Sequence, residues 1–142
     1  MKLELKHLAP YLPYSLKVNR YDAYEFFNPL DLMGFSYGKA EICNEGILSK
    51  DIALDKIKPI LRPLSDLTKE IEHKGRRFIP EAEIENLFGS FELNHNPELL
   101  HFKLDSWTTW SDLHSVTSKL FEWHFDVFNL IPNNLAININ DL

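Results

Sequence analysis

The chain has 142 residues, of which 44% are hydrophobic and 25% are charged, so it is long enough to bury the core of one globular domain without a disulfide or a structural metal. No apolar run approaches the ~20 residues of a membrane helix, and the charged first residues lack the apolar run of a signal peptide. A single cysteine, Cys43, excludes an internal disulfide. We therefore expect one domain over residues 1–142, located in the cytoplasm.

The charge is distributed unevenly. Residues 1–75 carry 11 basic and 11 acidic side chains, whereas residues 76–142 carry 4 basic and 10 acidic ones, which is the whole net charge of −6. Nonspecific nucleic-acid binding usually needs a basic surface, so this balance argues against it. An acidic second half is typical either of a solvated surface or of a surface that meets a basic partner.

The first half of the chain predicts helical turns and strands. Residues 7–14 predict a helical turn broken by Pro10 and Pro13. Alternating apolar and polar residues predict strands over 15–20 and 35–43, and a short one over 47–54. Pro59 and Pro63 argue against a helix or a central strand over 57–64, so that segment is predicted to be a packed connection.

Two helices are predicted next. Ser65 resembles an N-cap, Leu67 and Ile71 follow at helical spacing, and Gly75 resembles a helix stop. Residues 76–79 are predicted to be extended. Pro80 suits a first helical position, and the helix that follows is predicted to end at Gly89.

The remainder predicts a loop over 90–97, a strand over 100–104 and a long helix over 112–129 capped by Ser111. Apolar residues cover more than one face of that helix, so we expect it to be deeply buried. The tail near Ile137 predicts a last strand. Together these elements predict an α+β fold, with a small, mostly antiparallel sheet, about three helices and a long buried C-terminal helix.

Two groups of residues are candidates for protein binding. Glu81, Glu83 and Glu85 lie near the predicted positive end of a helix dipole, where the simplest role of their charge is to stabilise the helix. Trp107 and Trp110 flank a polar turn and would anchor an interface if exposed, or close a corner of the core if buried.

Lys74, Arg76 and Arg77 form the only compact basic cluster in the sequence, and they are the candidates for nucleic-acid contact. Three charges beside an acidic helix are a weak footprint for this purpose.

Signs of catalysis or cofactor binding are weak. No H-x-x-x-H, H-x-H or C-x-x-C pair is present, and the glycines match no phosphate-binding loop, so we expect no metal and no cofactor. His124 is predicted to be a hydrogen-bonded core histidine, and Cys43 an inert cysteine. A small hydrolase with a site around His124 or His95 remains a weaker alternative.

Three segments, HLAPYLPYSLKV, IKPILRPLSDLTKEIE and KLFEWHFDVFNLIPNNLAININ, resemble small uncharacterised proteins of phages, prophages and bacterial genomes. No activity is established for that family, so the resemblance implies a phage-associated setting and assigns no functional residue. In that setting the leading hypothesis is a non-enzymatic accessory protein that binds a host protein or ribonucleoprotein. The sharper version is an anti-CRISPR-type inhibitor of a defence nuclease, and the alternative is a small nucleic-acid-binding module.

Overall fold

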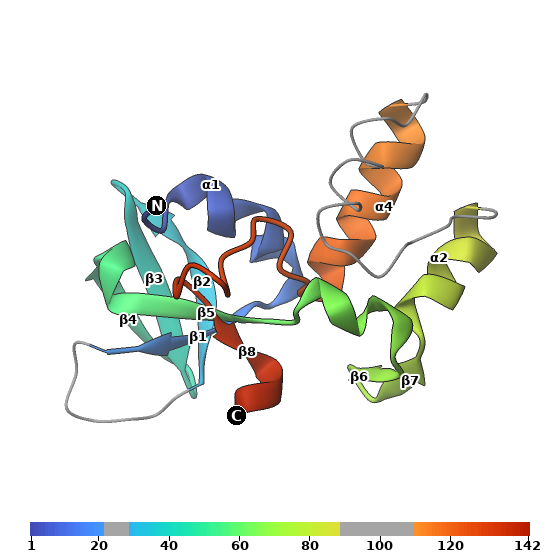
Figure 1. Ribbon diagram of the computed structural model, residues 1–142. Coiled ribbons are helices and arrows are strands. Elements are labelled where there is room, and N and C mark those ends of the chain that lie inside the picture. Colours follow the sequence, from blue (N-terminus) through green and yellow to red (C-terminus); the bar gives the residue numbers. More distant parts are fainter. Residues whose placement is uncertain (22–28, 89–109) are drawn as a thin grey trace.

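The computed structural model describes residues 1–21, 29–88 and 110–142, with the side chains of residues 88 and 110–114 excepted. Figure 1 shows a sheet with short helices on one side of the molecule, and a second region built from α2, α4 and a small hairpin on the other. The chain has mixed α and β content, and the main sheet is mostly antiparallel, which confirms the coarse fold prediction.

The main sheet has six strands in the order β4-β3-β2-β1-β5-β8. Neighbours are antiparallel except β5 and β8, which pair in parallel through Ile60 and Ile137. The strands are β1 Lys17–Arg20, β2 Leu30–Ser36, β3 Lys39–Asn44, β4 Ile47–Ile52, β5 Ile57–Leu61 and β8 Ile137–Asn138. The predicted strands over 15–20 and 47–54 and the predicted last strand are therefore confirmed in type, with shorter bounds.

The strand predicted over 35–43 is wrong, because the chain reverses within it. Ser36 pairs with Lys39, and the two residues between them, Tyr37 and Gly38, both have positive φ, 51° and 75°. Two-residue turns of this kind match the twist of the flanking strands, and glycine occupies their second position without strain. The turns Glu45–Gly46 and Lys74–Gly75 repeat the pattern.

The prediction that Pro59 excludes a central strand is also wrong, since Pro59 lies within β5 between β1 and β8. Pro59 faces Val18, and the bond from Tyr21 N to Lys56 O, 2.8 Å, continues the same register. Hydrogen-bonded and non-bonded pairs alternate in an antiparallel ladder, which places Pro59 at a non-bonded position. Its missing N–H therefore costs β1 no hydrogen bond.

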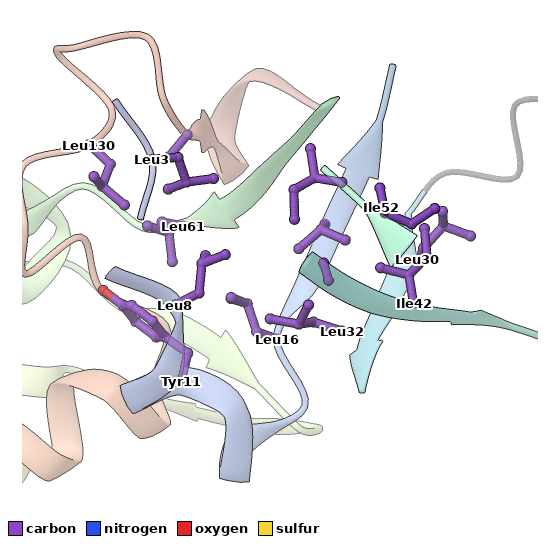
Figure 2. Packing of buried hydrophobic residues seen from close by; sticks show 14 residues of the cluster. Leu3, Leu8, Tyr11, Leu16, Leu30, Leu32, Ile42, Ile52, Leu61 and Leu130 are labelled. Carbon is purple, nitrogen blue, oxygen red and sulfur yellow. The ribbon is translucent and has the colours of Figure 1, made fainter. Parts of the chain in front are cut away.

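One face of the sheet is covered by α1 Leu5–Leu8 and the 3-10 helix η1 Ala9–Tyr14, so the predicted helical turn continues through both prolines. Leu8 and Leu16 lie near Leu61 and Leu32 of the sheet, and Tyr11 lies beside Leu8 (Figure 2). Fourteen buried residues form one apolar cluster here, which we call the sheet core. Its members are Leu3, Leu8, Tyr11, Leu16, Val18, Leu30, Leu32, Ala40, Ile42, Ile52, Ile57, Leu61, Leu130 and Ala136. Two further short 3-10 turns are η2 Leu54–Lys56, just before β5, and η4 Ile139–Asp141, just after β8.

The second region contains a separate group of buried side chains, which we call the second core. It forms between η3 Leu64–Thr68, the hairpin β6 Ile71–His73 and β7 Arg76–Phe78, α2 Pro80–Phe88 and α4 Trp110–Glu122. Its members are Leu64, Leu67, Ile71, Ile84, Val116, Leu120, Trp123, Phe125 and Val127. The helix predicted from Ser65 to Gly75 is wrong, because only the short 3-10 helix η3 forms and its N-cap is Pro63, so Ser65 lies inside it. Ile71 points inward in a strand, and Gly75 belongs to a hairpin turn. The predictions for 76–79 and for a helix starting at Pro80 are confirmed.

The long buried C-terminal helix is not formed. α4 ends at Glu122 instead of 129, and the C-terminus consists of turns, β8 and η4. Phe125 N bonds to Leu120 O at 2.9 Å and His124 N to Phe121 O at 3.0 Å, while His124 has φ 61°. This is the hydrogen-bond pattern of a Schellman ending, with histidine where glycine is usual. α4 also begins at Trp110, so Ser111 lies inside the helix and is not its cap.

Candidate functional site

The three glutamates of α2 divide between two sides of the helix. Glu83 turns toward the β6–β7 hairpin, where its Oε1 accepts a 2.6 Å hydrogen bond from Arg76 Nη2. Glu81 and Glu85 are four residues apart and so share another face. Glu85 is exposed and Glu81 is partly exposed, and neither forms an ion pair with a described residue. Of the three glutamates, Glu83 therefore forms an ion pair within the fold, whereas Glu81 and Glu85 carry charges that face outward.

The basic cluster is largely engaged in contacts within the protein. Arg76 pairs with Glu83 and lies 4.9 Å from the centre of the Phe78 ring, while Arg77 Nε lies 3.6 Å from Glu72 Oε2. Lys74 occupies the hairpin turn and is exposed. These surface pairs contribute little stability. Each carboxylate nevertheless offsets the positive charge of its arginine, which binding of a nucleic-acid phosphate would require.

The aromatic candidates fall outside the description of side chains. Trp107 and His95 lie outside the described residues, and Trp110 starts α4 with an undescribed side chain. Their proposed roles remain predictions.

A polar junction, which the sequence did not indicate, connects the two regions of the molecule. We use this name for Arg62, His73 and His124 together with the backbone that binds them. Arg62 follows the end of β5, and residues 124–126 lead from α4 back toward the sheet. Arg62 N donates to His124 O and Asp126 N donates to Arg62 O, both at 2.8 Å. The rings of His73 and His124 pack edge to face with centres 5.2 Å apart. Arg62 Nη2 also donates to Glu72 O at 2.7 Å.

The electrostatics of the polar junction favour uncharged histidines. The pKa of His124 is lowered to about 4, mainly by burial; the bond to the Tyr14 carbonyl opposes this shift, and electrostatic interactions with His73, Arg62 and Lys74 add to it. Burial, followed by Arg62 and Lys74, also lowers the pKa of His73. His124 Nε2 lies 2.7 Å from Tyr14 O, so the neutral ring donates its N–H to that carbonyl. The predicted hydrogen bond of His124 is thus present, but the residue is half-buried and follows the end of α4, so it is not a fully buried core histidine.

Two further buried polar groups fix the backbone around the junction. Tyr11 Oη donates to Phe125 O at 2.5 Å and accepts from Val127 N at 3.3 Å, and burial raises the pKa of its hydroxyl. The carboxylate of Asp126 accepts from Leu130 N at 2.7 Å and Ile131 N at 2.8 Å. Both side chains satisfy backbone groups that the early end of α4 leaves outside a helix.

The described residues contain no group of three histidine, cysteine, aspartate or glutamate side chains that converges on a metal position. Cys43 is partly buried on β3, opposite Asp31 and Leu48. Among the helices that the structure describes, none is long and apolar enough to cross a membrane.

No protein-family model matches the chain, and no match was found among curated proteins or solved structures.

Proposed function

We propose that this chain is a non-enzymatic accessory protein that binds a basic surface of a partner macromolecule through the outward face of α2. The observation that carries the proposal is the pair Glu81 and Glu85, which share one helical face and form no ion pair with a described residue. Nearby Arg76 and Arg77 are already paired with other glutamates, so the outward negative charge is not offset by them. Complementary charge mainly accelerates association and selects the partner.

The geometry of His124 favours binding over hydrolysis at this residue. A general base needs a pKa near the working pH and a free nitrogen facing the substrate. The pKa of His124 is lowered to about 4, and its Nε2 is engaged by the Tyr14 carbonyl. The ring therefore serves the junction between the two regions of the fold.

The ion pairs of the β6–β7 hairpin also weigh against a nucleic-acid module built on Lys74, Arg76 and Arg77. Two of these three charges face carboxylates of the same chain. Such a module predicts steeply salt-dependent binding to RNA or DNA alone. Binding of that kind at low salt would favour the alternative.

In its finer form, the proposal is that a phage-encoded protein of this type inhibits a host defence nuclease. CRISPR effectors hold their guide and target in positively charged channels, which an acidic helix face complements. The direct test is cleavage of a target DNA by a reconstituted effector, with and without the purified chain. Inhibition that is lost on charge reversal of α2 would support this form, and undiminished cleavage by a panel of effector types would contradict it.

The broader proposal is tested by capture from a host lysate with matched charge variants. Glu81→Lys with Glu85→Lys reverses the outward face, and Glu45→Lys with Glu70→Lys makes the same change in net charge at exposed positions elsewhere. We expect one partner to be retained by the wild type and the control pair and lost by the α2 pair. Equal retention by both pairs would overturn the assignment of this face.

A further inference from the structure

An open pocket is lined by the first residues of the chain, the tip of the β2–β3 hairpin and the segment that leads into β5. These segments lie on the opposite side of the molecule from α2 (Figure 1). Its volume is about 590 Å³, within the range of small-molecule sites. Apolar side chains form part of its lining, namely Leu3, Leu54, Ile57 and Leu135. A ligand in this pocket therefore needs an apolar or planar portion.

The charged lining of the pocket is positive in a chain that is negative as a whole. Three lysines, Lys2, Lys39 and Lys58, contribute to it against one carboxylate, Asp55. Lys2 and Lys39 are exposed and form no ion pair with a described residue. Lys58 is partly engaged, because its Nζ donates to Asn134 Oδ1 at 2.9 Å. This excess of lysine favours an anionic group on the ligand.

Tyr37 also lines this pocket, and its backbone conformation is not explained by a contribution of its side chain to the stability of the fold. Its side chain is 99% exposed, and its φ of 51° lies in the left-handed region, which bulky residues rarely adopt. The equivalent turns place Glu45 and Lys74 at the same position, so this turn does not require an aromatic ring. An exposed residue held in a costly conformation is often retained for a functional contact.

From the apolar lining, the excess of lysine and the exposed ring, we propose that this pocket binds a nucleotide. The base stacks on the ring of Tyr37, and Lys2 and Lys39 receive the phosphate. The site is separate from the acidic face of α2 and does not depend on the function proposed for it. The same chemistry occurs in a free mononucleotide and in a nucleotide of an RNA strand.

The hairpin turns supply a matched pair of variants. Tyr37→Asn removes the ring and introduces the residue that this turn type favours, whereas Glu45→Asn makes the same change in the equivalent turn at the other end of β3. Titration of the full chain with adenosine monophosphate is followed by calorimetry at low ionic strength. We expect Tyr37→Asn to weaken binding about tenfold, the scale of one lost base stack, and Glu45→Asn to leave it unchanged.

Charge variants separate the phosphate from the base. Lys2→Gln with Lys39→Gln should weaken the binding of adenosine monophosphate while leaving that of adenosine unchanged, and Asp55→Asn should strengthen the former. Comparison with a short oligoadenylate identifies the source, since a free nucleotide predicts equal affinities and a strand predicts tighter binding of the oligomer. Failure of the wild type to bind either probe, or binding indifferent to both Tyr37→Asn and the lysine pair, would overturn the proposal.

Discussion

The sheet core and the second core are stabilised in different ways. The sheet core is apolar except for the Tyr11 hydroxyl, and the antiparallel ladder satisfies most of the backbone around it. The second core borders the polar junction, in which Arg62, His73 and His124 are buried or half-buried. Apolar burial is insensitive to pH, whereas buried ionisable groups couple folding to protonation. Acid should therefore act first on the polar junction and the second core.

The largest expected effect is the loss of a core leucine from either group. Leu16 of the sheet core and Leu120 of the second core are both 0% exposed. Replacing either one by alanine should lower the free energy of unfolding by about 2–5 kcal/mol. Urea denaturation followed by tryptophan fluorescence and by circular dichroism measures this loss. Coincident transitions in both variants would support the expected single domain, and separate transitions would contradict it.

The next effect is the acid sensitivity of the junction. Because the pKa of His124 falls from 6.5 on folding to about 4, the unfolded chain binds more protons between these values. The contribution of His124 to the free energy of unfolding is therefore complete above pH 6.5 and is lost as the pH falls through 4. About 2 kcal/mol of it is lost between pH 7.5 and 5. His73 should add to this loss, since its pKa is also lowered. Urea midpoints at the two pH values provide the measurement.

The control for this prediction is His124→Gly. Glycine removes the titrating ring and suits the left-handed position after α4, where His124 has φ 61°. We expect much of the difference between the urea midpoints at pH 7.5 and 5 to disappear. An unchanged difference would assign the acid sensitivity to other groups.

A smaller effect is expected where the sheet core meets the returning chain. Tyr11→Phe keeps the ring but removes the hydroxyl that bonds to Phe125 O and Val127 N. We expect a loss of about 1–2 kcal/mol at neutral pH, because two buried backbone groups lose a partner. The loss should be the same at pH 5, unlike that from His124. No measurable loss would indicate that water replaces the hydroxyl.

The smallest effect lies in the turns of the sheet region. Glu45→Asn and Tyr37→Asn should each raise the unfolding free energy by about 0.5 kcal/mol, since asparagine tolerates positive φ better than either native residue. Thermal unfolding measures the gain. Destabilisation by Tyr37→Asn alone would assign the exposed ring a structural role.

Prediction from the sequence succeeded where a local pattern had a single consistent structure. Pro80 followed by glutamates predicted the start of α2, and the alternation over 15–20 predicted β1. Prediction failed at Gly38, which the pattern places inside a strand, and at Gly75, which it predicts to be a helix stop. Both lie in hairpin turns, because a glycine that follows one polar or aromatic residue fits such a turn equally well. Among the candidate residues, the sequence predicted that Glu81, Glu83 and Glu85 share one helix, but the pairing of Arg76 with Glu83 depends on how the hairpin packs against α2.

Composition and short-range periodicity are local properties, and they are sufficient to predict the mixed fold class, the start of α2 and the excess negative charge of the second half. Long-range contacts were needed to show that α4 stops at Glu122, that Pro59 fits a central strand, and that the ring of His73 packs against that of His124. Each of these depends on a partner far away in the chain. Arg62 binds the backbone on both sides of Phe125, and that long-range pairing replaces the hydrogen bonds that a longer helix would have made.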